Sequence, residues 1–231
     1  MTPFLYLAVA AIGYLLGSIP FGLIIGRLFS KKDVRQVGSG KIGMTNVLRT
    51  AGKKAAAVSL VLDILKGTVA VLIAALIFRN DADMVGLFTP TASAKVLAAL
   101  AALSGHVWPV FLKFKGGRGV ATFFGGLAAL YWPAALIGGA CVLGIGLRTK
   151  YMSLGSIIGA VIAFILIMTL DILRVRFLGP YPAFEYVVYS MIGAMFIYVM
   201  HRDNIQRLFA GTERRIGEKP KATPPAGEFD N

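Results

Sequence analysis

The segment 38–49 combines small, polar and basic residues in a pattern suited to holding a phosphate group. It reads Gly-Ser-Gly-Lys-Ile-Gly-Met-Thr-Asn-Val-Leu-Arg. Glycines let a backbone turn tightly and bring its N–H groups close to an anion. Between and after them come neutral hydrogen-bonding side chains and two cations, namely Ser39, Thr45, Asn46, Lys41 and Arg49. An ordinary basic loop beside a membrane would explain the cations but not the glycines (38, 40 and 43) or the neutral polar side chains.

A second basic, glycine-rich stretch leads directly into an apolar run. Lys113 and Lys115 precede Gly116-Gly117-Arg118-Gly119. A glycine-rich turn that opens a helix offers free N–H groups and the positive end of the helix dipole to an anion. A basic turn between two membrane spans is the alternative interpretation. Two such loops on the same predicted face favour the phosphate-binding one.

Three smaller polar groups accompany these loops. His201 and Asn204 are three residues apart, so on a helix they share a face, although a simple helix cap would also explain them. The run 17–22, Gly-Ser-Ile-Pro-Phe-Gly, predicts a kink with small-residue packing. Asp63 and Lys66 have the spacing of an ion pair inside an apolar helix, and a structural role is favoured over a catalytic one.

The composition is that of a membrane protein. Hydrophobic residues make up 57% of the 231 residues and charged residues only 15%. The net charge of +13 comes from cations in short loops between apolar runs. Anionic lipid and topology explain that charge better than nucleic acid, for which no motif is present. The one cysteine, Cys141, permits no intrachain disulfide, and no zinc spacing exists, so no metal or cofactor is expected.

The apolar runs predict an all-α polytopic integral membrane protein with seven transmembrane helices, because a span needs about 20 apolar residues. Two of them, about 119–131 and 133–148, are short and antiparallel, divided at Tyr131-Trp132-Pro133. A six-span alternative fuses these two and places Arg148 and Lys150 outside. The remaining spans are expected at 1–26, 55–78, 93–112, 151–172 and 184–201.

The basic residues orient this topology. Nineteen of the 24 Lys and Arg residues fall on one side of the seven-span model. The positive-inside rule then places the N-terminus outside and the C-terminus in the cytoplasm. Residues 1–211 form one membrane domain. Residues 212–231, rich in charge, proline and glycine, are expected to be a disordered cytoplasmic tail.

Taken together, the motifs resemble those of the bacterial membrane-integral acyl-phosphate:glycerol-3-phosphate acyltransferases. The segments that carry the resemblance are 17–22, 38–49, 105–122 and 201–205, and the hydropathy matches along nearly the whole chain short of the tail. The resemblance implies transfer of a fatty acyl group from acyl phosphate to the 1-hydroxyl of glycerol 3-phosphate. The products are lysophosphatidic acid and phosphate, in the first acylation of bacterial phospholipid synthesis. It also implies a multi-pass protein of the bacterial plasma (inner) membrane with a cytoplasmic active site, no cofactor, and other phospholipid-synthesis enzymes as partners.

The resemblance also assigns residues. The catalytic set would be Ser39, Arg49, Arg118, His201 and Asn204. The phosphate-binding set would be Gly38, Gly40, Lys41, Gly43, Thr45, Asn46, Lys115, Gly116, Gly117 and Gly119. Two positions depart from the family pattern, which usually has Asn at position 41 and Lys at position 118. Arg keeps the charge but changes its geometry to a planar fork.

Two questions stay open at this point. A phosphate oxygen of the donor, as the family suggests, or His201 could take the proton from the attacking hydroxyl. A transporter or channel for a phosphorylated solute would use the same cationic face. It should, however, carry polar residues along several spans, and only Asp63 and Lys66 lie deep.

Overall fold

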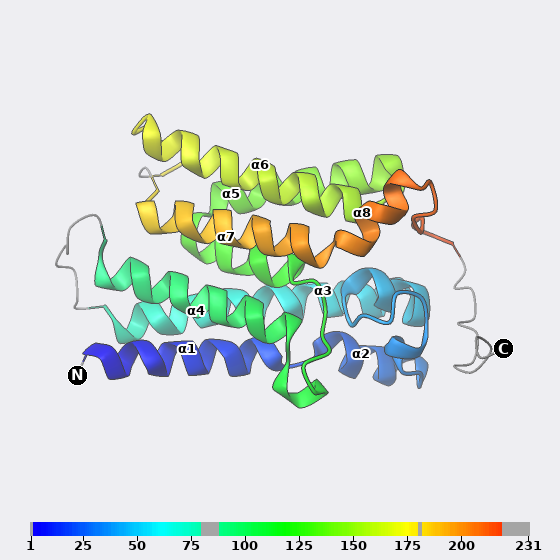
Figure 1. Ribbon diagram of the computed structural model, residues 1–231. Coiled ribbons are helices and arrows are strands. Elements are labelled where there is room, and N and C mark those ends of the chain that lie inside the picture. The colour runs from blue at the N-terminus through cyan, green and yellow to red at the C-terminus, as the bar shows by residue number, and fades with distance from the viewer. Residues whose placement is uncertain (1, 80–87, 180–181, 219–231) are drawn as a thin grey trace.

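The computed structural model describes residues 2–79, 88–179 and 182–218, and these form a bundle of α-helices that run roughly parallel to one long axis (Figure 1). The helices are α1 (Thr2–Ser18), α2 (Phe21–Ser30), α3 (Met44–Ile77), α4 (Pro90–Val107), α5 (Val120–Thr149), α6 (Met152–Ile172), α7 (Phe184–Met200) and α8 (Arg202–Phe209). Two short 3₁₀ helices, η1 (Val34–Gln36) and η2 (Val110–Leu112), lie in the connecting segments.

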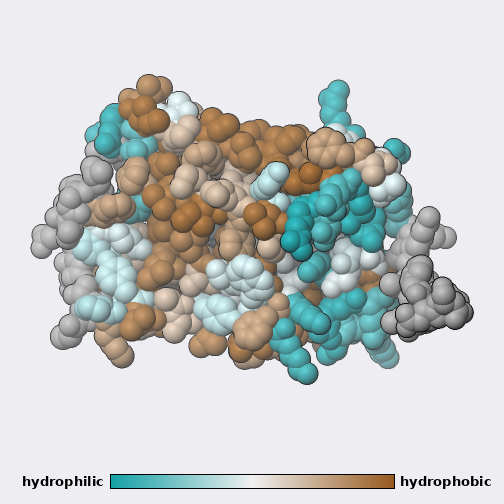
Figure 2. Space-filling view, viewed as in Figure 1, coloured by the Kyte–Doolittle hydropathy of each residue, from teal (hydrophilic) through white to brown (hydrophobic). Residues whose placement is uncertain are grey.

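Length and apolarity mark this bundle as a membrane protein. Five helical stretches in the described residues are long and apolar enough to cross a bilayer, with α1 and α2 counted together. A sixth is reached if α7 and α8, which meet at a bend of 58°, count as one span. On the face seen in the space-filling view, apolar residues cover the middle of the bundle and hydrophilic residues gather at the end that carries α8 (Figure 2).

Helix α5 is two helical arms rather than one rod. Its backbone leaves helical geometry at Tyr131, with φ −152° and ψ 88°. Pro133, which lacks an N–H, follows at once. The ring of Phe124 packs against Gly138, although a straight helix would hold these residues ~21 Å apart. The arms therefore run antiparallel, and the predicted break at Tyr131 is confirmed.

The first two predicted spans have different bounds in the structure. The run expected at 1–26 is divided between α1 and α2 at Ile19–Pro20. Helix α3 begins at residue 44 rather than 55, because residues 44–51 are themselves helical and the break falls at Gly52, whose φ is 84°. The small-residue packing expected around 17–22 is confirmed, since Gly17 lies directly against the backbone of Ala102.

The polar segments gather at one end of the bundle. The segment 31–43, the start of α3 and all of α8 lie at the end opposite the N-terminus, and the turn after α4 lies between them and the middle (Figure 1). Residues 212–218 also belong here. The amide of Thr212 donates to the carbonyl of Arg207, and that of Ile216 to the carbonyl of Lys150, both at 2.8 Å. This part of the expected tail is therefore held against the bundle, and residues 219–231 lie outside the described residues.

Candidate active site

A cavity of about 440 Å³ opens among α3, α5, α6, α8 and the segment 39–43. We call it the central cavity. All five residues of the predicted catalytic set line it, although they lie as far apart as 165 positions in the chain. Five residues of the predicted phosphate-binding set line it too, namely Lys41, Gly43, Thr45, Asn46 and Gly119. Segments that are remote in sequence thus meet at one site.

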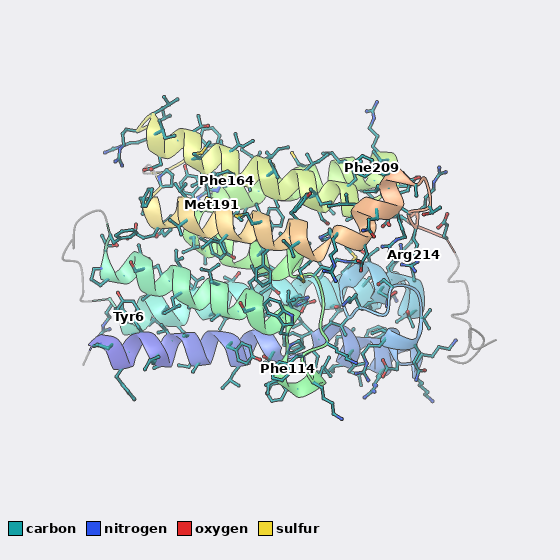
Figure 3. The ribbon with its side chains drawn as sticks, viewed as in Figure 1. Tyr6, Phe114, Phe164, Met191, Phe209 and Arg214 are labelled. Carbon is teal, nitrogen blue, oxygen red and sulfur yellow. The ribbon has the colours of Figure 1, made fainter. Side chains whose placement is uncertain are left out.

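One end of the cavity is strongly cationic. Lys41, Arg49, Arg118 and Arg214 line it, and no ion pair recorded among the described residues includes any of them. Arg214 is labelled in Figure 3, beside the segment that follows α8. Burial lowers the pKa of Arg118 to about 10, so this side chain stays charged at neutral pH. Four cations without fixed partners predict an anionic ligand.

Three helices begin at the wall of the cavity without a side-chain cap. They are α3 at Gly43, α5 at Gly119 and α6 at Tyr151. The first turn of an uncapped helix presents free N–H groups and a partial positive charge. Residues of each first turn line the cavity, including Thr45, Val120 and Ser153. The backbone therefore adds to the attraction that the four cations exert on an anion.

The segment 34–41 is shaped by one amide side chain. Nδ2 of Asn46 donates to the carbonyls of Val34, Val37 and Lys41 at 2.6, 3.0 and 2.9 Å, and its Oδ1 accepts from the amide of Ser39 at 3.1 Å. Gly38 has φ 63°, and a Cβ there would lie 2.3 Å from the same Oδ1. Asn46 was predicted to bind phosphate, but its side chain is fully used in folding the loop that presents Ser39.

A carboxylate from the predicted tail, Glu213, joins α6 and α8 at the wall of the cavity. Glu213 is buried, and its Oε1 accepts from Asn204 at 2.6 Å and from Ser153 at 3.0 Å. Its Oε2 accepts from Nε of Arg207 at 2.8 Å. The three contacts join α6, α8 and the segment after α8, and they leave Oδ1 of Asn204 buried without a hydrogen-bond partner among the described residues. In the sequence, Glu213 is distinguished only as the single acidic residue in the segment 207–215, which also holds three arginines.

His201 stands at the junction of α7 and α8, where it is buried at the cavity wall. Its Nδ1 lies 2.7 Å from the carbonyl of Ile197. A carbonyl can only accept, so the neutral ring carries its proton on Nδ1 and leaves Nε2 as an acceptor. The imidazole is thus set to accept a hydrogen bond from a hydroxyl.

The turn 116–119 is held by buried charges. Asp63 forms the predicted ion pair with Lys66, whose Nζ lies 2.9 Å from Oδ1, and the same oxygen lies 3.5 Å from Nδ1 of His106. Lys66 also donates to the carbonyl of Ile19 at 3.0 Å. The ring of His106 packs directly on Gly117, where a Cβ would clash with Nε2. This network reaches the residue next to Arg118. His106 lies in the segment 105–122 that carries the family resemblance, but the sequence assigns it no role.

The opposite end of the cavity is apolar. Leu60 and Ile64 on α3 face Phe124 on the first arm of α5 and a row of residues on its second arm. That row consists of Ala135, Leu136, Gly139, Ala140, Val142 and Leu143. The cavity therefore joins a pole suited to anions to a pole suited to hydrocarbon.

Five residues of the predicted phosphate-binding set lie outside the central cavity. Gly40, Lys115 and Gly116 line a second cavity of about 550 Å³ together with Asp33, Arg35 and Gln36, and Lys41 lines both cavities. Gly38 and Gly117 line neither of the two, since each packs against the side chain that shapes its loop.

Comparison with known proteins relates the chain to one protein family. Residues 7–211 match the model of the family described as glycerol-3-phosphate acyltransferase. A glycerol-3-phosphate acyltransferase 3 of Dehalococcoides mccartyi is 49% identical over 222 residues, covering 93% of this chain and 97% of the relative. A glycerol-3-phosphate acyltransferase of Rhodopseudomonas palustris is 46% identical over 215 residues, covering 93% and 98%.

Two solved structures are similar throughout. The crystal structure of PlsY (YgiH), an integral membrane glycerol 3-phosphate acyltransferase, in its glycerol 3-phosphate form superposes with a TM-score of 0.78 at 37% identity, covering 92% of this chain and 96% of that one. The lysophosphatidic acid form of PlsY superposes with a TM-score of 0.75 at 36% identity, covering 91% and 94%.

Proposed function

The chain belongs to the glycerol-3-phosphate acyltransferase family, and we propose that it transfers a fatty acyl group from acyl phosphate to the 1-hydroxyl of glycerol 3-phosphate. The bond between the acyl carbon and the phosphate oxygen breaks, and an ester bond to the glycerol oxygen forms. The hydroxyl proton leaves with the phosphate as hydrogenphosphate. The products are lysophosphatidic acid and inorganic phosphate.

The observation that carries this proposal is that one cavity has a cationic end and an apolar end. Acyl phosphate and glycerol 3-phosphate each carry about two negative charges at neutral pH, as phosphate monoesters do. Four cations without fixed partners and three uncapped helix starts line one end, and only the donor needs the apolar other end. A site for two small anions alone would have no use for the apolar row on α5.

The residue roles follow from where each side chain is held. Arg49 and Arg118 bind the two phosphates together with the amides that begin α3 and α5. Ser39, whose amide is fixed by Asn46, directs its hydroxyl to a substrate oxygen. Asn204, fixed through Nδ2, has Oδ1 left to accept from a hydroxyl of glycerol 3-phosphate.

The donor is already activated by its phosphate leaving group, so the site has to supply position and charge stabilisation. Nε2 of His201 accepts a hydrogen bond from the attacking hydroxyl and aligns it. A phosphate oxygen of the donor then takes the proton. His201→Gln separates this role from that of a general base: loss of a base should lower kcat by about 10²–10⁴-fold with KM nearly unchanged. Loss of a positioning contact should raise KM for glycerol 3-phosphate instead.

The proposal includes a topology. The two arms of α5 count as separate crossings, which gives seven spans in the plasma membrane with the N-terminus outside. The cavity faces the cytoplasm, because the segments that hold most of the cations share its end of the bundle. Partnership with other phospholipid-synthesis enzymes stays a prediction.

Purified protein in lipid nanodiscs, given palmitoyl phosphate and labelled glycerol 3-phosphate, should form labelled lysophosphatidic acid and one equivalent of phosphate. Arg49→Ala at the same protein concentration is the matched control and should form at least about 10²-fold less, as for loss of a group that stabilises transition-state charge. Uptake of glycerol 3-phosphate into vesicles with no acylated product would establish the transporter and refute the proposal.

A further inference from the structure

The second arm of α5 presents two adjacent glycines with opposite surroundings. A Cβ on Gly138 would lie 2.8 Å from the Cβ of Ala163 and the carbonyl of Gly159, so a larger residue cannot fit between α5 and α6. A Cβ on Gly139 would meet nothing within 4 Å. Gly139 lines the central cavity, at its apolar end. Packing explains the first glycine and does not explain the second.

Backbone conformation does not explain Gly139 either. Its φ is not positive, so every residue type can adopt its geometry. Glycine is among the poorest helix formers, and a helix gains from almost any other residue at such a position. What a glycine does provide here is empty space in the wall of the cavity.

The neighbours of Gly139 show where that space leads. Leu136 and Leu143, one turn before it and one turn after it, line the cavity and are nevertheless 61% and 47% exposed. Leu60 and Ile64 of α3 line the cavity as well. The apolar end is thus a trench that is open to the lipid-facing surface, with Gly139 in the middle of its α5 wall.

We propose that Gly139 determines which acyl chains the enzyme accepts, because the chain of the donor lies across it on the way from the cationic end to the lipid. This inference rests on the proposed function and adds the specificity of its donor site. A side chain at position 139 would occupy the trench and obstruct long chains. Donors whose chains end before Gly139 would be spared.

The test compares Gly139→Leu with wild type on palmitoyl phosphate and octanoyl phosphate. We expect kcat/KM for the palmitoyl donor to fall at least 10-fold more than kcat/KM for the octanoyl donor, with Gly139→Ala between wild type and Gly139→Leu. Gly144→Leu is the control: a Cβ there also meets nothing within 4 Å, but the residue is exposed and does not line the central cavity. It should leave the ratio of the two donors unchanged.

A binding measurement keeps the inference separate from the reaction. Hexadecyl phosphate and octyl phosphate present the same headgroup and chains but have no acyl group to transfer. The Tm increase that hexadecyl phosphate gives should be lost in Gly139→Leu and retained in Gly144→Leu, whereas the increase from octyl phosphate should persist in both. If wild type bound these ligands in this way but made no lysophosphatidic acid, the proposed function would fail while the assignment of Gly139 stood.

Two outcomes would overturn the assignment. In one, Gly139→Leu and Gly139→Ala change both donors by the same factor, which would place position 139 at the headgroup or in the general packing. In the other, Gly139→Leu alters neither donor. A Tm of the ligand-free variant within a few degrees of wild type shows that the comparison is made on folded protein.

Discussion

The two glycine-rich segments that contribute to the wall of the central cavity are held in place in different ways. The segment 38–43 is folded by Asn46, which lies within twelve residues of all its partners. The turn 116–119 is held by His106, Asp63 and Lys66, and Lys66 in turn reaches Ile19 on another helix break. One loop is therefore a local unit, whereas the other depends on the assembled core.

This difference predicts how each loop fails. Damage to the local brace should reshape one wall of the cavity and leave the bundle intact. Damage to the buried charges should weaken the bundle itself, because a charge left without its partner in a buried site is expensive. Stability and kinetics measured on the same variants separate the two cases.

The largest effect is expected from Asp63→Asn. The substitution keeps the shape but leaves Lys66 buried without its counter-charge, so the free energy of unfolding should fall by about 3–5 kcal/mol. Reversible unfolding in detergent measures this change. Arg202→Gln is the control, because the ion pair between Arg202 and Asp203 has side chains that are 81% and 64% exposed, so neither charge is left buried. Its cost should be about 1 kcal/mol or less.

The double variant Asp63→Asn with Lys66→Met sharpens this test. Removing both charges should restore part of the stability that either single substitution loses, because no uncompensated charge is left. If the loss in the free energy of unfolding of the double variant equalled the sum of the two single losses, Asp63 and Lys66 would not stabilise each other as an ion pair.

Asn46→Ala should damage catalysis more than stability. Three carbonyls and one amide lose their common partner, but three of these four hydrogen bonds are only partly buried, so water can replace them once the side chain is removed. We expect kcat/KM to fall by about 10–100-fold and Tm to fall by only a few degrees. If Asn46→Ala unfolded the protein as readily as Asp63→Asn, the idea of a local unit would be wrong.

Two glycines of the first loop should differ in their tolerance of substitution. Gly38→Ala forces a side chain into positive φ and against Asn46, so it should reproduce the kinetic defect of Asn46→Ala. A Cβ on Gly43 would meet nothing within 4 Å, and the φ of Gly43 is not positive. Gly43→Ala should therefore change the free energy of unfolding by no more than about 0.5 kcal/mol and leave the Tm close to that of wild type. Equal Tm losses in the two variants would contradict the assignment.

The smallest effect is expected from Lys41→Asn, which introduces the residue usual in the family. Lys41 is exposed and lies between the two cavities, so water and salt screen its charge. KM for glycerol 3-phosphate should rise by about 2–5-fold at low ionic strength, and the difference should shrink in 0.5 M salt. A salt-independent change would indicate a direct contact instead of a general attraction.

The sequence revealed the parts of the site that have a local signature. Glycines beside basic residues identified both loops, and the polar ends of the apolar runs predicted that both lie on the same side. The break at Tyr131 could be predicted because proline and aromatic residues interrupt an otherwise continuous apolar run.

The remaining features depend on contacts between distant segments. Asn46 looks like a ligand for phosphate in the sequence, and only the folded loop shows that its amide is already used. Glu213 lies two residues after Gly211 in a charged segment that resembles a disordered tail, and it is held by hydrogen bonds from Ser153 on α6 and Asn204 on α8. His106 acts through Asp63, 43 positions earlier, and no periodicity indicates that pairing.

If both loops serve one ligand site, Arg49 and Arg118 contact substrates bound in the same cavity, and a double-mutant cycle between them measures this. Arg49 lies near the start of α3, after the first loop, and Arg118 lies in the second loop, before α5. Both line the central cavity. The single variants Arg49→Lys and Arg118→Lys and their combination are measured by kcat/KM for acyl transfer. We expect a coupling energy of about 0.5–3 kcal/mol, as for groups that share a partner. Strict additivity, with a coupling energy of about zero, would mean that the two arginines act at separate sites and would contradict this expectation.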